Sequence, residues 1–367
     1  MYFDVDLRCK EYFKGLKQVF LYLTDECNLR CSYCLYKPDL TFQLREKEIP
    51  VRTAINVISD FREMGASKLT IIGGEPTLYG ASNSWRPLLD LISASKDLGY
   101  EYVRIDTNGS FEESLLHKKE FRMLDEITFS LDSDSSEITD LLRGERVFDR
   151  CVGNMKAAVQ LGYRVDITCC AHKENIGRDN KGALILHRLI LFAESLGVYR
   201  INFHPLFKMG VPRDTWIGDA DIQPDEWLRV HDEIKQNLED GLYKIIVRIP
   251  QRFITKEEFA NQPEYYGYCP VKMGERVLIH PNGVLRVCAL MIGTPYGVAR
   301  LFGNQISWDE TSTNETRNHK LGENTPCANQ RKDFGDLLPL CISFKAKQDE
   351  IIWKEKLRWE SRRKETS

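Results

Sequence analysis

Eleven cysteines are the most chemically informative feature of this 367-residue chain. Three of them, Cys27, Cys31 and Cys34, form a C-x3-C-x2-C pattern in the segment TDECNLRCSYC. Three thiolates this close in sequence can bind three corners of a [4Fe–4S] cube and leave the fourth iron open to another ligand. Ferredoxins supply four cysteines per cluster, so three predict chemistry at the iron. The alternative is structural zinc, but zinc usually takes four ligands and no fourth lies nearby in the sequence.

A second group of four cysteines lies in the C-terminal part of the chain: Cys269, Cys288, Cys327 and Cys341. The first two belong to a C-x13-G-x4-C pattern that contains Gly283 in the segment IHPNGVLRVC. The PNG triplet predicts a tight hairpin turn, which brings Cys269 and Cys288 into one neighbourhood. On local spacing alone, four thiolates suit a complete [4Fe–4S] cluster and a structural zinc ion equally well.

The remaining cysteines carry no ligand motif. Cys169 and Cys170 end an apolar segment and are interpreted as small core residues, with hydrogen-atom donation to a substrate as the alternative. Cys9 and Cys151 are expected to be structural. His204 ends another apolar segment, and we expect a structural histidine there, with a place in a cavity as the alternative.

The elements that position these residues follow from the hydrophobic pattern. Strands are predicted at 19–23, 68–74, 102–106, 127–132, 164–170 and 200–205, and helices at 51–64, 85–97, 146–161 and 183–196. Repeated βα units predict a parallel sheet with right-handed crossovers. Six strands are too few to close an eight-stranded barrel, so we expect an α/β fold built on a partial, open (β/α)6 barrel of the TIM type. Ligands of such folds bind at the C-terminal ends of the strands.

Four regions are predicted along the chain. The barrel occupies residues 1–206, and residues 207–268 form a connecting, substrate-shaping segment with a helix near 224–239 and a short strand at 244–249. Residues 269–344 form a small, cysteine-rich α+β domain, and residues 345–367 form a C-terminal helix.

Composition excludes several classes of protein. The chain is 42% hydrophobic and 29% charged, with a net charge of -3, so we expect neither a nucleic-acid nor a membrane partner. It lacks any run of about 18 apolar residues, and its first residues do not resemble a signal peptide. We therefore expect a cytoplasmic protein. In a reducing cytosol, clustered cysteines indicate metal or catalytic sites rather than disulfides.

The cysteine pattern after the first strand, with GGEPTL at 73–78 after the second, resembles the radical S-adenosylmethionine (SAM) superfamily. The resemblance covers the barrel half of the chain. It implies that the open iron is chelated by the amino and carboxylate groups of SAM, and that Tyr33 is the aromatic residue commonly found before the third cysteine. The residues implied to bind the SAM amino group are Gly73, Gly74, Glu75 and Pro76.

Further strand ends resemble the SAM site of this superfamily. They are TNG at 107–109 and SLDS at 130–133. Asn108 is implied to line the SAM site, and Ser130 and Asp132 are implied to contact the ribose hydroxyls and carboxylate of SAM. Arg143 is implied to pair with that carboxylate. Asn175 is a weaker candidate of the same kind. The alternative for each is an ordinary turn residue or a surface charge.

The second cysteine group resembles the SPASM/twitch domain, an auxiliary-cluster module of many radical SAM enzymes. The sequence lacks the C-x2-C-x5-C-x3-C run of a full SPASM domain, so the resemblance fits the shorter twitch version. It implies one auxiliary [4Fe–4S] cluster bound by all four cysteines, and it favours iron–sulfur over zinc.

The resemblance also implies a reaction. An external donor such as flavodoxin or ferredoxin supplies one electron, SAM is cleaved to a 5′-deoxyadenosyl radical, and this radical abstracts a substrate hydrogen. The auxiliary cluster then accepts a second electron, which completes a two-electron oxidation by dehydrogenation or bond formation. This predicts an oxidoreductase. A non-enzymatic electron carrier is the alternative from another class, and it would need neither SAM nor the GGEP motif.

Two substrate classes fit this reaction. We expect a small-molecule substrate of the natural-product or aminocyclitol type, because only 26 residues precede Cys27, where many peptide-modifying relatives carry a leader-recognition domain. The alternative is a maturase that forms thioether or carbon–carbon links in a ribosomally made peptide. The molybdopterin-precursor synthase is another relative, but it ends in Gly-Gly whereas this chain ends in KETS, so we do not expect that identity.

Overall fold

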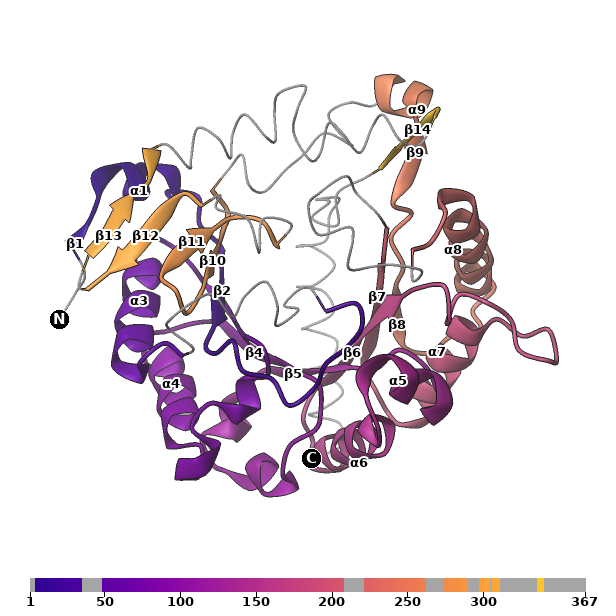
Figure 1. The fold of residues 1–367 in the computed structure, drawn as a ribbon, viewed down its shortest axis with the longest axis horizontal. Helices are drawn as coiled ribbons and strands as arrows, with labels where there is room; N and C mark the ends of the chain where they lie inside the picture. The colour runs from indigo at the N-terminus through magenta and orange to yellow at the C-terminus, as the bar shows by residue number, and fades with distance from the viewer. Residues whose placement is uncertain are drawn as a thin grey trace.

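The computed structural model describes residues 4–34, 48–207, 221–261, 274–289, 297–303, 305–310 and 335–339. One curved sheet of twelve strands organises these residues (Figure 1). Its strands are β1 (Asp4–Val5), β2 (Gln18–Tyr22), β3 (Lys68–Ile72), β4 (Tyr102–Thr107), β5 (Glu126–Ser130), β6 (Val165–Ala171), β7 (Arg200–Pro205), β8 (Ile246–Arg248), β10 (Arg276–Ile279), β11 (Val284–Arg286), β12 (Ala299–Phe302) and β13 (Gln305–Trp308).

The middle of the sheet is the predicted barrel. Strands β2 to β8 follow one another in chain order, and every neighbouring pair is parallel. The expected partial barrel of α/β type is confirmed, and the short strand expected at 244–249 is β8, which extends the parallel series beyond six strands. The C-terminal ends of strands β2 to β8 therefore lie along one edge of the sheet.

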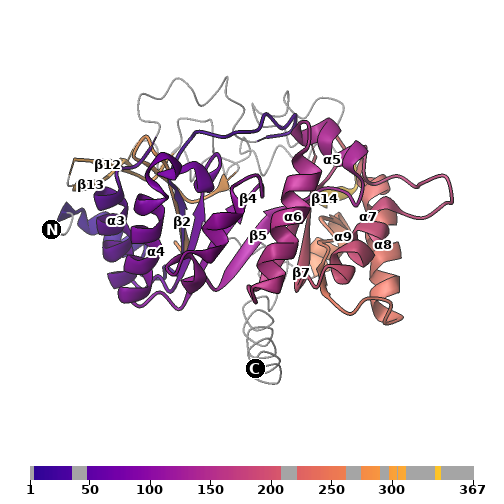
Figure 2. The same ribbon diagram turned by 90° about the horizontal axis from the view of Figure 1, so that it is seen from below.

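Helices cover the outer side of the curved sheet (Figures 1 and 2). Those that follow strands of the barrel are α3 (Val51–Glu63), α4 (Arg86–Asp97), α5 (Ser136–Arg143), α6 (Val147–Gln160), α7 (Ile185–Ser195) and α8 (Pro224–Glu239). Short helices α1 (Leu7–Tyr12) and α9 (Lys256–Asn261) lie outside this series. Glycines in the left-handed region follow α6 and α7, at Gly162 (φ 81°) and Gly197 (φ 77°), a conformation that commonly ends a helix.

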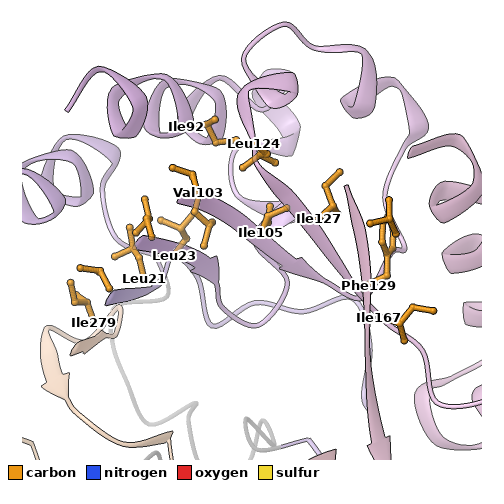
Figure 3. Close-up of a cluster of buried hydrophobic side chains, with 14 of the residues drawn as sticks. Leu21, Leu23, Ile92, Val103, Ile105, Leu124, Ile127, Phe129, Ile167 and Ile279 are labelled. Carbon is orange, nitrogen blue, oxygen red and sulfur yellow. The ribbon is translucent and has the colours of Figure 1, made fainter. Parts of the chain in front are cut away.

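The main core lies between the sheet and these helices. Strand residues of one parity, such as Val103, Ile105 and Phe129, point toward the helices and are fully buried (Figure 3). Residues of the other parity face the inner side of the sheet, and in β4 and β6 many of them are charged or polar. This alternation explains why the strands of the barrel could be predicted from the sequence.

The C-terminal strands continue the same sheet. Strand β10 pairs in parallel with β2, and β10 to β13 form an antiparallel meander that ends beside β1. The hairpin predicted from the PNG triplet is confirmed as β10–β11. Gly283 in its turn has φ 76°, and a Cβ there would lie 2.4 Å from the carbonyl oxygen of Leu301. Only glycine tolerates both conditions.

The rest of the C-terminal region is described in part. Strands β9 (Phe253–Thr255) and β14 (Leu337–Pro339) form a separate two-stranded sheet. The helix expected at 345–367 lies outside the described residues, and the boundaries between the four predicted regions stay predictions. Among the described residues, no helix is long and apolar enough to cross a membrane.

Candidate functional site

The three clustered cysteines lie in the loop that follows β2, at the C-terminal edge of the sheet. Burial and, to a smaller extent, the charges of Glu75, Cys31 and Cys34 raise the pKa of the Cys27 thiol to about 12, so the three sulfurs are electrostatic neighbours. Burial also raises the pKa of Cys31, and Arg143 opposes that shift. A bound metal offsets this cost because it stabilises the thiolate form. The donors therefore suit iron binding.

The described part of the chain holds no group of three His, Cys, Asp or Glu side chains that converges on a single metal ion. A [4Fe–4S] cube does not require such convergence, because each thiolate binds a different iron. Binding of a cluster by the three cysteines therefore stays a prediction.

The two glycines of GGEP allow the end of β3 to approach the cysteine loop. The Gly74 amide donates to the Thr24 carbonyl at 2.6 Å, and the Glu75 amide donates to the Glu26 carbonyl at 2.7 Å. A Cβ on Gly74 would lie 2.2 Å from the Glu26 carbonyl oxygen, and one on Gly73 would lie 2.6 Å from that of Thr24. These glycines thus bring backbone against backbone just before Cys27, and their role toward SAM stays a prediction.

Glu75 is fully buried, and its carboxylate links the ends of β3 and β4. It accepts hydrogen bonds from the Thr77 amide (3.1 Å) and hydroxyl (2.7 Å), the Thr107 hydroxyl (2.7 Å) and the Asn108 amide (2.7 Å). Burial raises its pKa, and these donors oppose the rise. Pro76, also buried, begins the 3-10 turn η1 (Pro76–Leu78). The predicted contact of Glu75 with the SAM amine would add to these four bonds.

Asn108 joins this group to the first cysteine. Its side-chain amide donates to the Asn28 side chain at 2.8 Å and lies 3.8 Å from the Cys27 sulfur. Ser130, the last residue of β5, is half-buried at the same edge. The structure therefore places Asn108 beside Cys27, and it places Ser130 at the same C-terminal edge of the sheet.

Asp132 and Arg143 pair with each other. The Arg143 guanidinium contacts both carboxylate oxygens, at 2.7 and 3.1 Å, and the Tyr33 hydroxyl donates to the same carboxylate. The Cys170 amide donates to it at 2.9 Å, and the Asn175 side chain donates to the Asp132 carbonyl at 2.8 Å. The structure therefore brings the predicted residues Asp132 and Arg143 together, and the Asp132 carboxylate accepts hydrogen bonds from Tyr33, Arg143 and Cys170. The implied contacts of Asp132 and Arg143 with SAM stay predictions.

Three buried polar atoms around the cysteine loop have no hydrogen-bond partner among the described residues: Asp25 Oδ2, Ser110 Oγ and His172 Nε2. Asp25 lies two residues before Cys27, and the Ser110 carbonyl accepts from Asn28. The His172 ring stacks near Tyr33 at 5.8 Å, and its Nδ1 accepts from the Glu174 amide, so the neutral ring carries its proton on Nε2. Unsatisfied buried groups are costly. They fit a polar molecule with amine, carboxylate and hydroxyl groups, such as SAM.

The second cysteine group is described only at Cys288, which is buried just after β11. Cys269, Cys327 and Cys341 lie outside the described residues, so their grouping stays a prediction.

The sequence analysis missed a buried ion network on the inner side of β4 to β7. Glu126 contacts Arg164 at 3.0 Å and Arg200 at 2.9 Å, and Arg200 also pairs with Asp166. Burial alone would raise the pKa of Glu126, but Arg200, Arg164 and Arg104 hold it below its ordinary value. The signal was present, because charged residues alternate with apolar ones in RVDIT and YVRIDT.

Cys170 and His204 lie directly opposite each other on the neighbouring strands β6 and β7, closer to the cysteine loop. Burial and, to a smaller extent, the charges of Arg252 and Arg104 lower the pKa of His204 to about 4. Cys170 is half-buried and electrostatically coupled to Cys31 and Cys34. Cys169, by contrast, is fully buried in the core, as predicted.

The model of the radical SAM superfamily matches residues 21–178, which span the cysteine loop, GGEP and the strand ends described above. Over these residues the chain is similar to the radical SAM superfamily. It is a radical SAM enzyme, with a [4Fe–4S] cluster and SAM as its cofactors. The residues around the cysteine loop fit both.

Curated relatives include "Probable GTP 3',8-cyclase" from Saccharolobus solfataricus, which is 26% identical over 75% of this chain and 83% of its own length. "Molybdenum cofactor biosynthesis protein 1" from Drosophila melanogaster is 30% identical, over 40% of this chain and 25% of its own length.

Solved structures with a similar fold include Streptococcus suis SuiB bound to precursor peptide SuiA. Its TM-score is 0.58 at 16% identity, over 81% of this chain, and the chain spans 64% of the length of SuiB. Native anSMEcpe with bound AdoMet and Kp18Cys peptide has a TM-score of 0.55 at 14% identity, over 75% of each chain. At these identities the similarity concerns the fold.

Proposed function

We propose that this radical SAM enzyme catalyses a two-electron oxidation of a small-molecule substrate, with an auxiliary [4Fe–4S] cluster as acceptor of the second electron. The observation that carries the SAM chemistry is the arrangement of Cys27, Cys31 and Cys34 beside Glu75 and Asp132 at the C-terminal edge of the barrel. This edge is where ligands of such sheets bind.

When bound, the reduced cluster and SAM supply a carbon radical that removes hydrogen from an unactivated C–H bond. The protein's own residues then have three tasks. The cysteines hold the cluster, and the glycines of GGEP keep the end of β3 close to the loop. The buried carboxylates Glu75 and Asp132 fix the strand ends against that loop, so that the reacting groups stay in register and water is excluded.

A small-molecule substrate is supported by the cyclase relatives. The Saccharolobus solfataricus protein is matched over 83% of its length, and its name gives a nucleotide as the substrate. The relative named for molybdenum cofactor biosynthesis points in the same direction. A purine nucleotide therefore ranks beside an aminocyclitol among substrates to test.

A peptide maturase is the second candidate. It is favoured by the fold similarity to SuiB and anSMEcpe, both of which were solved with a bound peptide. At 16% and 14% identity the similarity concerns the fold, so this candidate ranks behind a small molecule.

The test begins with protein reconstituted anaerobically with iron and sulfide. With dithionite and SAM, we expect 5′-deoxyadenosine by mass spectrometry, and Cys31→Ala should abolish it. GTP, aminocyclitols and peptides, each deuterated, are then compared for deuterium transfer into that product. A wild-type protein loaded with iron that never forms 5′-deoxyadenosine contradicts the proposed function. Transfer from a peptide alone selects the second candidate.

A further inference from the structure

A buried hydrogen-bond network connects the cysteine loop to β5 and α5. It consists of Tyr33, Asp132 and Arg143, and we call it the Tyr33 network. Asp132 is fully buried, while Tyr33 and Arg143 are 8% and 5% exposed. Arg143 contacts both oxygens of Asp132, and Tyr33 donates to the oxygen that also accepts from Arg143 Nε. A buried charge pair with every oxygen hydrogen-bonded is a rigid contact.

Within this network Tyr33 is the only member that belongs to the cysteine loop. The Arg143 guanidinium lies 5.5 Å from the centre of the Tyr33 ring, and His172 stacks on that ring at 5.8 Å with an interplanar angle of 23°. The neighbouring Ser32 amide donates to the Leu142 carbonyl at 3.0 Å, which ties the same turn to the end of α5. The turn between Cys31 and Cys34 is therefore fixed to three elements that come later in the chain.

The acceptor of the Tyr33 hydroxyl differs from those of two other buried tyrosines, Tyr79 and Tyr100. The hydroxyls of Tyr79 and Tyr100 donate to backbone carbonyls, of Ile49 at 2.5 Å and of Ile58 at 2.8 Å. The Tyr33 hydroxyl instead donates to an ionised carboxylate, and hydrogen bonds to charged groups are roughly twice as strong as neutral ones. It does so one residue before the third cysteine of the pattern.

We infer that the Tyr33 network fixes the Cys31–Cys34 turn against the ends of β5 and α5, and that Tyr33 is a positioning residue for the first cluster. This inference rests on the proposed function for the identity of the cluster. The network holds two of the three cysteines in place before any cofactor binds, because each of its contacts is made by the protein alone. Cys27 is held separately, through Asn108 and Asn28.

The test compares Tyr33→Phe with Tyr100→Phe in cluster-loaded protein without SAM. Both variants keep the ring and remove one buried hydroxyl, but Tyr100 donates to a carbonyl of α3, on the outer side of the sheet. We expect a chelator to remove iron about tenfold faster from Tyr33→Phe than from wild type, the factor that corresponds to about 1.4 kcal/mol for one charged hydrogen bond. Tyr100→Phe should lose iron at the wild-type rate.

Two further measurements separate positioning from general stability. Hydrogen exchange of the 27–34 peptide should be faster in Tyr33→Phe and unchanged in Tyr100→Phe, while thermal unfolding of the two variants should agree. The low-temperature EPR spectrum of the reduced cluster should also change in Tyr33→Phe. Arg143→Lys keeps the charge but loses the two-point contact, so it should accelerate iron loss as well.

Equal rates of iron loss in Tyr33→Phe, Tyr100→Phe and wild type would overturn the inference, and so would unchanged exchange of the 27–34 peptide. If Tyr33→Phe unfolds, the rate in Arg143→Lys decides. None of these readouts needs SAM cleavage. The two proposals can therefore fail separately. If the wild-type protein never cleaves SAM but Tyr33→Phe loses iron faster, the proposed function is wrong and the inference about the Tyr33 network stands.

Discussion

At the scale of single residues, the buried carboxylates Glu75 and Asp132 bind other parts of the protein as well as facing the predicted SAM site. Sequence motifs identified both residues, but the motifs did not identify their partners. The donors to Glu75 come from Thr107 and Asn108 on the next strand, and the donors to Asp132 include Tyr33, 99 residues earlier in the chain. Such pairings depend on which strands are neighbours, so local spacing could not predict them.

Glu75→Gln should destabilise the protein by about 2 kcal/mol, because the amide nitrogen replaces one carboxylate oxygen and faces at least one of the donors that this oxygen now accepts from. Urea unfolding, monitored by circular dichroism, measures the change. Glu137→Gln, at an exposed position in α5, is the matched control and should leave the free energy of unfolding within about 0.5 kcal/mol of wild type. Equal stability of the two variants would contradict the prediction.

His204 should make stability fall in acid. Its pKa is about 4 in the folded protein, against an ordinary value of 6.5. Above pH 6.5 both folded and unfolded chains carry it neutral, so it has no effect there. Between pH 6.5 and 4 the unfolded chain binds the extra proton, and at pH 5 this lowers the free energy of unfolding by about 1–2 kcal/mol.

The measurement is the difference in urea midpoint between pH 7.5 and pH 5 for cluster-free protein. His204→Gln should reduce that difference, because the group that titrates has been removed. His117→Gln, at an exposed position with 58% of its side chain accessible, should retain the wild-type difference. The prediction is wrong if both variants keep the full pH dependence.

At the scale of elements, the ends of strands were predicted better than their environment. The strands at 68–74 and 102–106 end in GGEP and TNG, and both were assigned correctly from alternation and glycine. The sequence did not show which atoms Gly73 and Gly74 approach at the end of β3. In the structure they lie against the carbonyls of Thr24 and Glu26. Strands β1, β12 and β13 were missed, since segments of two to four residues are too short to show a period.

Gly74→Ala should displace the cysteine loop, because its Cβ would lie 2.2 Å from the Glu26 carbonyl oxygen. Backbone must move to relieve that contact, so we expect a loss of about 3 kcal/mol in stability and reduced iron binding. Gly153→Ala is the matched control. Gly153 lies exposed inside α6 with nothing within 4 Å of the added Cβ, so that variant should gain about 0.5–1 kcal/mol. Both are measured by urea unfolding and iron content, and normal iron content in Gly74→Ala would refute the prediction.

At the scale of the whole molecule, the C-terminal strands and the barrel share one sheet. The sequence predicted a separate cysteine-rich region, because alternation of strands and helices stops near residue 206. It did not predict that β10 would pair in parallel with β2, the strand that carries the cysteine loop, because that pairing joins Gln18 to Arg276 across most of the chain. Tertiary pairing over such a distance leaves no local signal.

Removing residues 269–367 should therefore damage the barrel itself rather than release an independent domain. The deletion exposes the edge of β2, and its four paired residues from Gln18 to Leu21 lose their neighbours on β10. The aromatic stack of Tyr22 on His280 is lost as well. An exposed edge strand is a template for aggregation. We expect the 1–268 protein to form soluble aggregates in size-exclusion chromatography and to melt without a cooperative transition. The full chain should melt in one. A monomeric 1–268 protein with a sharp transition and normal iron content would show that the barrel is independent, and would mean that the contact between β2 and β10 contributes little to holding the cysteine loop.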